Sequence, residues 1–303
     1  MNKFKFLFYI PLLLITACGE GKVSIDNINY KPKIVIRGLI FPGQPVSGIS
    51  ITRNLPIREQ QLTLDQLIIA DAKVVITNVS STVTDTLVFD PITATYYDPE
   101  HNFSVQYNTI YRLNVAAQID GKNLNASSET KVPQQGFSII EESSRLDSLH
   151  YRERDEKDSI RTFTVRFERS VNAETYLMSM NALDADTSTY VYSPVNPYSD
   201  LKPSDVLKDL DDFKYSTQWS SLFENQPGQS EMSVFWFFLS FYGRYQMVVY
   251  AADENYSDFI NTYDQVQDID GNYDEPVFHI DGDGIGVFGS AIADTVYFKV
   301  LKP

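Results

Sequence analysis

The chain ends in DGDGIGVFGSAIADTVYFKVLKP (residues 281–303), where Gly284, Gly286 and Gly289 have the spacing of the glycine fingerprint of dinucleotide-binding proteins. That fingerprint needs a helix after it, a second strand, and an acidic residue about 20 positions further on. Too few residues follow for that acid, and residues 293–300 have the pattern of a β-strand. The sequence therefore excludes a nucleotide site here. It predicts that the three glycines serve a tight turn or close backbone packing at the entrance to a last strand.

The first residues have the pattern of a targeting segment. Lys3 and Lys5 precede an apolar run at residues 6–16, which has the length of a signal-peptide core and is too short to span a bilayer. The run ends in Ile-Thr-Ala-Cys, which resembles the lipobox of bacterial lipoproteins, with Cys18 as the acylated residue. The alternative is an ordinary cleaved signal followed by an incidental cysteine.

Cys18 is the only cysteine of the chain, so an internal disulfide is impossible and an exported thiol needs another explanation. Acylation, for example by palmitate, supplies it. Several acyl chains make a stable anchor, so we expect residues 1–17 to be a lipoprotein signal peptide, residues 18–30 a tether, and the protein to be held in the lipid of the outer membrane. The sequence leaves open whether it faces the periplasm or the exterior.

The composition indicates a folded acidic protein rich in β-structure. The formal net charge is −15, which disfavours binding to nucleic acid, and the hydrophobic content of 43% allows a real core. Nineteen Tyr and nineteen Phe favour strands over helices. The length suggests about two domains.

Residues 31–135 are predicted to form a β-sandwich of immunoglobulin type. Short extended runs are separated by Pro, Gly, Asn and Asp, and Asp120-Gly121 between two of them predicts a tight hairpin turn. The seven predicted strands are 31–40, 47–54, 70–78, 85–90, 94–98, 109–119 and 122–132.

Residues 136–303 are predicted to form a larger antiparallel β-sandwich with one or two short helices. Residues 163–167 alternate as a half-buried strand, with 175–184 as its neighbour. The two candidate helices are 202–213, capped by Ser204, and 257–267, capped by Ser257.

The most apolar stretch, residues 232–253, has two interpretations. Gly243 and Arg244 interrupt it, which favours two buried strands joined by a turn over a membrane helix. Its aromatic residues fit the core of a sandwich, or they form a platform for stacking sugars. These residues are Phe235, Trp236, Phe238, Phe241 and Tyr242.

No catalytic residues can be assigned. The only histidines, His101, His150 and His279, lie far apart in sequence, and neither a zinc-protease helix pattern nor a nucleophile elbow occurs. A carboxylate pair of the glycosidase kind stays open, because acids are plentiful and no pattern selects two of them. We expect a protein that is not an enzyme and has no cofactor.

A calcium site is the one metal hypothesis. Acids and an amide alternate from residue 268, but Gly271 stands at the fourth position and His279 at the twelfth, unlike an EF-hand. Acidic turns between strands explain the pattern as well. The candidate ligands are Asp268, Asp270, Asn272, Asp274, Asp281 and Asp283.

These features resemble a family of Bacteroidetes outer-membrane lipoproteins, the domain of unknown function 4249. The resemblance covers nearly all of the chain after Cys18 and rests on that cysteine, the strand around 32–40, the strand at 70–78, residues 110–133 and the glycine-rich end. Asp281-Gly282-Asp283-Gly284 replaces the Asn-Ile-x-Gly-Gly that members more often carry. The resemblance implies an accessory lipoprotein, often associated with TonB-dependent transporters, and supplies no catalytic residue.

Two functions follow as expectations. The first is a membrane-anchored accessory or binding lipoprotein that partners a TonB-dependent β-barrel transporter or binds its ligand. The second is a carbohydrate-active protein of the cell surface, lectin-like or a hydrolase, with Trp219, Trp236 or tyrosines exposed in a cleft. A purely structural surface protein is a third option.

Overall fold

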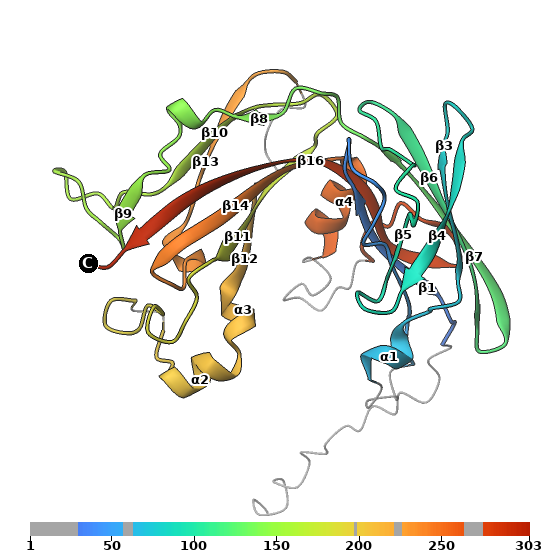
Figure 1. Cartoon of the computed structure of the whole chain (residues 1–303), viewed down its shortest axis with the longest axis horizontal. Helices are drawn as coiled ribbons and strands as arrows, with labels where there is room; N and C mark the ends of the chain where they lie inside the picture. The colour runs from blue at the N-terminus through green and yellow to red at the C-terminus, as the bar shows by residue number, and fades with distance from the viewer. Residues whose placement is uncertain (1–29, 57–62, 197–198, 221–225, 264–274) are drawn as a thin grey trace, which may run out of the picture. The chain divides into compact units, whose positions relative to one another are not determined.

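A computed structural model describes residues 30–56, 63–196, 199–220, 226–263 and 275–303. Residues Pro32–Pro303 form one unit, and of the other unit, Met1–Lys31, only residues 30 and 31 are described. Cys18 and the predicted signal peptide therefore lie outside the described residues. The all-β prediction is confirmed, since strands in three sheets dominate Pro32–Pro303 and the helices are short (Figure 1).

A six-stranded antiparallel sheet has the order β15-β7-β6-β3-β4-β5. Five of its strands come from the first half of the chain, and the two-residue β15 comes from the C-terminal stretch. The strands are β3 (Lys73–Asn78), β4 (Thr84–Asp90), β5 (Thr95–Tyr97), β6 (Ile110–Ile119), β7 (Lys122–Lys131) and β15 (Asp281–Gly282).

A seven-stranded sheet has the order β12-β11-β14-β16-β1-β2, and β9 also pairs with β16. It joins the beginning of the described chain to its end. The strands are β1 (Ile34–Ile40), β2 (Ser50–Arg53), β9 (Ser148–His150), β11 (Thr175–Ala182), β12 (Tyr215–Ser220), β14 (Gly243–Ala252) and β16 (Gly284–Leu301).

The third sheet has three strands in the order β13-β10-β8, and short helices lie between strands along the chain. The strands are β8 (Ser138–Ile139), β10 (Thr164–Glu168) and β13 (Gln229–Ser233). The helices are α1 (Leu64–Leu67), α2 (Pro203–Lys208), α3 (Leu210–Lys214) and α4 (Glu254–Tyr263), with the 3₁₀ turns η2 (Glu141–Ser143) and η3 (Trp236–Phe238).

Strand β16 takes part in two β-sandwiches, one after the other along its length. Its residues 284–290 pair in parallel with β1, and its residues 291–300 pair antiparallel with β14. One hydrophobic core lies between β1, β2, the start of β16 and the six-stranded sheet, and it includes Phe288. A second core includes Phe298 and residues of β10, β11, β13 and β14. Residues 31–135 therefore do not make up the first core alone, and the predicted boundary near 135 stays a prediction.

The glycines at the start of β16 lie within the strand, where other backbones approach it closely. Gly286 has a φ of +108°, and a Cβ there would lie 2.0 Å from the Ile36 oxygen of β1. A Cβ at Gly284 would lie 2.7 Å from that of Ala126 in β7, and one at Gly289 would lie 2.8 Å from Asp253 Oδ1. The stretch thus brings β1, β7 and the start of α4 together.

The local predictions had mixed outcomes in the first half and around the helices. All seven strands expected before residue 135 are present, and the hairpin turn is confirmed, since Asp120 and Gly121 have φ values of 52° and 74°. The helix caps were wrong. Lys202, rather than Ser204, precedes α2, and α4 begins three residues before Ser257.

One pairing and one strand expected in the second half were also wrong. β11 pairs with β12 and β14, whereas β10 lies in the three-stranded sheet. Residues 234–242 contain η3 and form no strand, because Trp236 turns into the core there while its neighbours stay outside. Among the described residues, no helix is long and apolar enough to cross a membrane.

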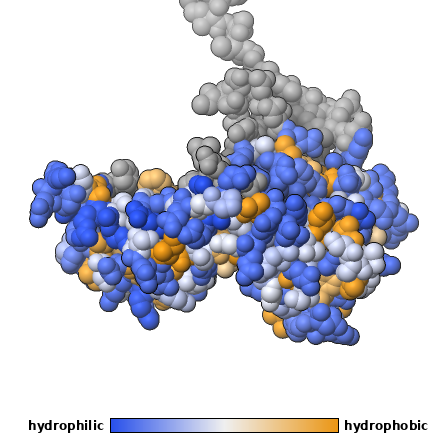
Figure 2. Space-filling view, turned by 90° about the horizontal axis from the view of Figure 1, so that it is seen from above, coloured by the Kyte–Doolittle hydropathy of each residue, from blue (hydrophilic) through white to orange (hydrophobic). Residues whose placement is uncertain are grey.

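Figure 2 shows one face of the molecule, on which hydrophobic residues lie in small groups. On this face, they alternate with hydrophilic residues. Single exposed hydrophobic residues are normal for a folded protein, so they do not by themselves mark an interface.

Candidate ligand-binding surface

The outer face of the six-stranded sheet is the best-formed candidate site. Strand alternation turns Val74 and Ile76 of β3 fully into the first core, so Lys73 and Val75 point outward. Asn114 of β6 and Asn125 of β7 are exposed for the same reason.

The strand register places these residues in rows across the sheet. One row runs from Val75 through Asn114 and Ser127 to Asp281. In the next row, Lys73 and Asn125 lie on either side of Ala116.

A third row borders the first. Arg112 and Glu129 lie opposite each other in β6 and β7, and Arg112 Nε donates to Glu129 Oε1 at 2.7 Å. This ion pair supplies longer side chains beside the short ones of the other two rows.

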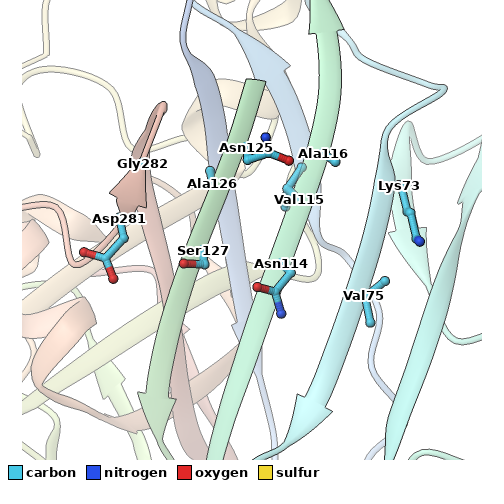
Figure 3. A pocket seen from close by; sticks show the side chains of 10 residues that line it. All are labelled: Lys73, Val75, Asn114, Val115, Ala116, Asn125, Ala126, Ser127, Asp281 and Gly282. Carbon is cyan, nitrogen blue, oxygen red and sulfur yellow. The ribbon is translucent and has the colours of Figure 1, made fainter. Parts of the chain in front are cut away.

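The short side chains leave a hollow of about 560 Å³ (Figure 3). Small ligands commonly bind in hollows of this size, although this one is shallow and open. Its lining residues are Lys73, Val75, Asn114, Val115, Ala116, Asn125, Ala126, Ser127, Asp281 and Gly282.

Five polar side chains around the hollow are available to a ligand. Within the part of the chain that the structure describes, none of them makes a hydrogen bond or an ion pair through its side chain. They are Lys73, Asn114, Asn125, Ser127 and Asp281. Amides and a hydroxyl both donate and accept hydrogen bonds, so the group can bind a polar molecule in several orientations.

The charges of the hollow are balanced. Lys73 and Asp281 lie three strands apart, which corresponds to roughly 14 Å. At that separation in water their attraction is weak. The centre of the hollow therefore suits an uncharged polar ligand better than an anion or a cation.

The calcium candidates are only partly described. Asp268, Asp270, Asn272 and Asp274 lie outside the described residues. Asp281 lines the hollow, and Asp283 Oδ2 accepts a hydrogen bond from the Asn125 backbone N–H at 3.2 Å. Among the described residues, no group of three or more His, Cys, Asp or Glu could hold a metal ion.

The aromatic residues of 232–253 divide between core and surface. Trp236 is buried and its Nε1 donates to the Arg161 oxygen at 2.8 Å, and Phe241 is fully buried. Phe235 stays half exposed and stacks with Phe237 at 5.6 Å. Phe238 and Tyr242 pack partly buried against the second core. The predicted platform is thus not one continuous surface.

The other candidate residues do not form a common site. His279 Nε2 lies 2.8 Å from Asp258 Oδ2 of α4, whereas His150 Nδ1 contacts the Lys302 oxygen. The His101 backbone N–H donates to Asp98 Oδ1 at 3.0 Å.

Apart from Asp281, a calcium candidate, sequence reasoning missed the polar residues of the hollow, and it also missed one buried polar group. Asn114 and Asn125 occupy outward positions of strands that were predicted, but only the sheet order shows that they meet. Asp253 is buried, and it accepts hydrogen bonds from the Thr130 hydroxyl and from the Tyr256 backbone N–H at 3.2 Å. Its burial raises its pKa to about 6, although these hydrogen bonds act in the opposite direction.

The comparisons with known proteins identify a family and little more. No curated protein matches the chain. Among solved structures, a tetra-tandem repeat in the extending region of a large adhesion protein is similar at 10% sequence identity, with a TM-score of 0.21. That match covers 89% of this chain, which spans about half, 49%, of the other. The family described as Domain of unknown function (DUF4249) matches residues 20–292, so the chain belongs to the DUF4249 family.

Proposed function

We propose that the protein is a membrane-anchored binding lipoprotein of the outer membrane, which partners a TonB-dependent transporter or binds its ligand. The anchoring part rests on the sequence alone, because Cys18 follows a signal-like apolar run and is the only cysteine. The transporter is the partner that the family resemblance implies.

The binding part rests on one observation. Several polar side chains without partners among the described residues surround a hollow on an otherwise regular sheet face. Small solutes captured for transport are commonly polar, and amides and hydroxyls bind them reversibly through hydrogen bonds.

A pull-down from the native membrane tests this proposal. The tagged, lipidated protein is solubilised in mild detergent and compared with a Cys18→Ala variant, with mass spectrometry of the co-purifying proteins. We expect a large β-barrel transporter in stoichiometric amount with the wild type, and its loss with the variant, because the anchor holds the two in one membrane.

One further readout makes the result decisive. The mass of the N-terminal peptide shows whether Cys18 carries acyl chains. An unmodified Cys18 contradicts the anchor, and a lipidated protein that purifies alone contradicts the transporter partnership.

The lectin-like form of the carbohydrate hypothesis is the second candidate, because amides and hydroxyls suit sugars. The hydrolase form has less support. Asp281 is the one carboxylate that lines the hollow. Asp85 and Asp98 interact elsewhere, where burial and Asp98 raise the pKa of Asp85. The Asp98 carboxylate, however, accepts backbone hydrogen bonds from Glu100 and Phe103, which is a structural role. The proposal therefore contains no catalytic step.

A further inference from the structure

A second polar face lies on the seven-stranded sheet. The register places Tyr215 of β12, Asn181 of β11, Gln246 of β14 and Tyr297 of β16 in one row across four strands. Their sequence neighbours on the other face of the sheet, such as Met180, Met247 and Phe298, are buried in the second core. The four residues of the row therefore point away from that core.

The two tyrosines at the ends of the row are exposed. Tyr215 has 55% and Tyr297 has 59% of its surface exposed. Three strand spacings separate them, roughly 14 Å, with two amides between. Gln246 Nε2 donates to the Tyr297 hydroxyl at 3.4 Å, which helps to orient that ring. The spacing leaves room for several sugar rings between and over the tyrosines.

The amide between Tyr215 and Gln246 has an unusual environment. Asn181 Oδ1 is shielded from solvent and has no hydrogen-bond partner in the described part of the chain. A shielded amide oxygen without a hydrogen-bond partner destabilises the folded protein. A bound polyol that donates a hydroxyl hydrogen bond to this oxygen would remove the deficit.

The next row adds hydroxyl groups around an apolar centre. Thr217, Ser179, Val248 and Thr295 follow one another across the same four strands. None of the three hydroxyls has a side-chain partner among the described residues. Helix α4 packs further along this sheet, against Leu177 and Tyr250, and covers neither row.

We propose that these two rows bind a pyranose oligosaccharide. A pyranose presents apolar C–H groups on its ring faces and hydroxyls at its edge, which match tyrosine rings and an amide-hydroxyl centre, respectively. A partner protein with an apolar surface would instead displace water from the amides without replacing the hydrogen bonds of that water. The inference rests on the proposed binding role and assigns it a ligand class and a site distinct from the hollow.

Binding to defined hexasaccharides tests the inference. The lipidated protein, in a detergent without a sugar head group, is titrated calorimetrically with cellohexaose, xylohexaose, mannohexaose, maltohexaose and hexagalacturonate. We expect at least one to bind. Tyr215→Ala and Tyr297→Ala should each weaken its binding about tenfold, which corresponds to about 1.4 kcal/mol, and Tyr297→Phe should bind nearly as the wild type does.

Matched controls separate this site from other surfaces. Tyr263→Ala removes a tyrosine of α4 with a similar exposure, 57%, and should leave binding unchanged. Tyr107→Ala, at a tyrosine of the first half of the chain with 39% of its surface exposed, should do the same. If hexagalacturonate binds best, the result supports a site that combines this face with Lys299, which lies beside the tyrosine row.

Two results would overturn the inference: no hexasaccharide binds, or binding persists unchanged in both tyrosine-to-alanine variants. Circular dichroism melting curves show whether each variant is folded. The measurement uses the purified protein, so it stays independent of whether a transporter is found in the pull-down.

Discussion

At the scale of single residues, Gly286 carries the strictest steric demand of the glycine-rich end. Gly286→Ala combines a positive φ with a Cβ placed 2.0 Å from the Ile36 oxygen, and strand pairing with β1 prevents that oxygen from moving freely. We expect a loss of about 3 kcal/mol or more in the free energy of unfolding, from backbone strain and overpacking together. Urea denaturation followed by circular dichroism measures it.

Gly43→Ala is the matched control. Gly43 also has a positive φ, +77°, but no atom lies within 4 Å of the position of its Cβ. The free energy of unfolding of this variant should fall by only about 1–2 kcal/mol, which is the contribution of backbone strain. Equal losses in the two variants would show that close packing against β1 is not what requires Gly286.

The glycines also show how much of the fold a local sequence pattern can predict. Their spacing and the strand after them were enough to reject a nucleotide site and to expect close packing or a turn. The packing partners were not predictable, because β1 lies about 250 positions earlier in the chain and no local pattern records that pairing. The hollow was missed for the same reason, since its residues come from four separate strands.

At the scale of elements, helix α4 begins at a buried carboxyl group. Asp253 precedes α4, and its carboxyl group accepts a hydrogen bond from the backbone N–H of Tyr256 in the first turn. Burial raises its pKa to about 6 from an ordinary 3.8. The folded state therefore holds this proton more tightly than the unfolded state. The stabilising contribution is complete below about pH 4 and is lost as the pH rises through about 6.

Asp253→Asn tests the sign of this dependence. An amide stays neutral, and its oxygen can still accept from Tyr256 while its nitrogen donates to Thr130. Relative to the wild type, the free energy of unfolding of the variant should rise with pH, by up to about 3 kcal/mol between about pH 4 and pH 8. Urea titrations across that range measure the difference.

The comparison of the variant with the wild type cancels the contributions of the ionisable groups that the two proteins share. The contact between Asp258 of α4 and His279, which lies outside that helix, is present in both proteins and cancels. A difference that is constant or falls with pH would mean that Asp253 is ionised in the folded protein throughout the range, stabilised by its hydrogen bonds.

Some helices and strands were predicted correctly from the sequence and others were not. The strands of the first half follow from alternation and turn residues, which are local properties. The predicted start of α4 was wrong because Ser257 is a residue type that commonly caps helices. Asp253, which precedes the helix, was assigned to the end of a strand. Residues 234–242 were expected to be strand from their aromatic content, but the burial of Trp236 against the Arg161 oxygen turns the chain instead.

At the scale of the whole unit Pro32–Pro303, β16 links the two cores. Phe288 is buried in the first core, and Phe298, ten residues later on the same strand, is buried in the second. A loss of order in either core frees the half of β16 that pairs there, and because the strand is continuous, the other half loses its fixed end. We therefore expect the two cores to unfold in one cooperative transition, despite the two-domain prediction from length.

Phe288→Ala tests this coupling with a distant probe. Trp236 belongs to the second core, so in a Trp219→Phe background its fluorescence reports unfolding there. Removing a buried aromatic ring from the first core should cost about 3–5 kcal/mol, and cooperative unfolding requires the Trp236 signal to shift to lower urea by the corresponding amount. Val83→Ala, at a half-exposed position in the first half of the chain, should shift it little. If the fluorescence midpoint stays fixed while circular dichroism shows a second, earlier transition, the cores unfold separately and β16 acts as a linker between domains.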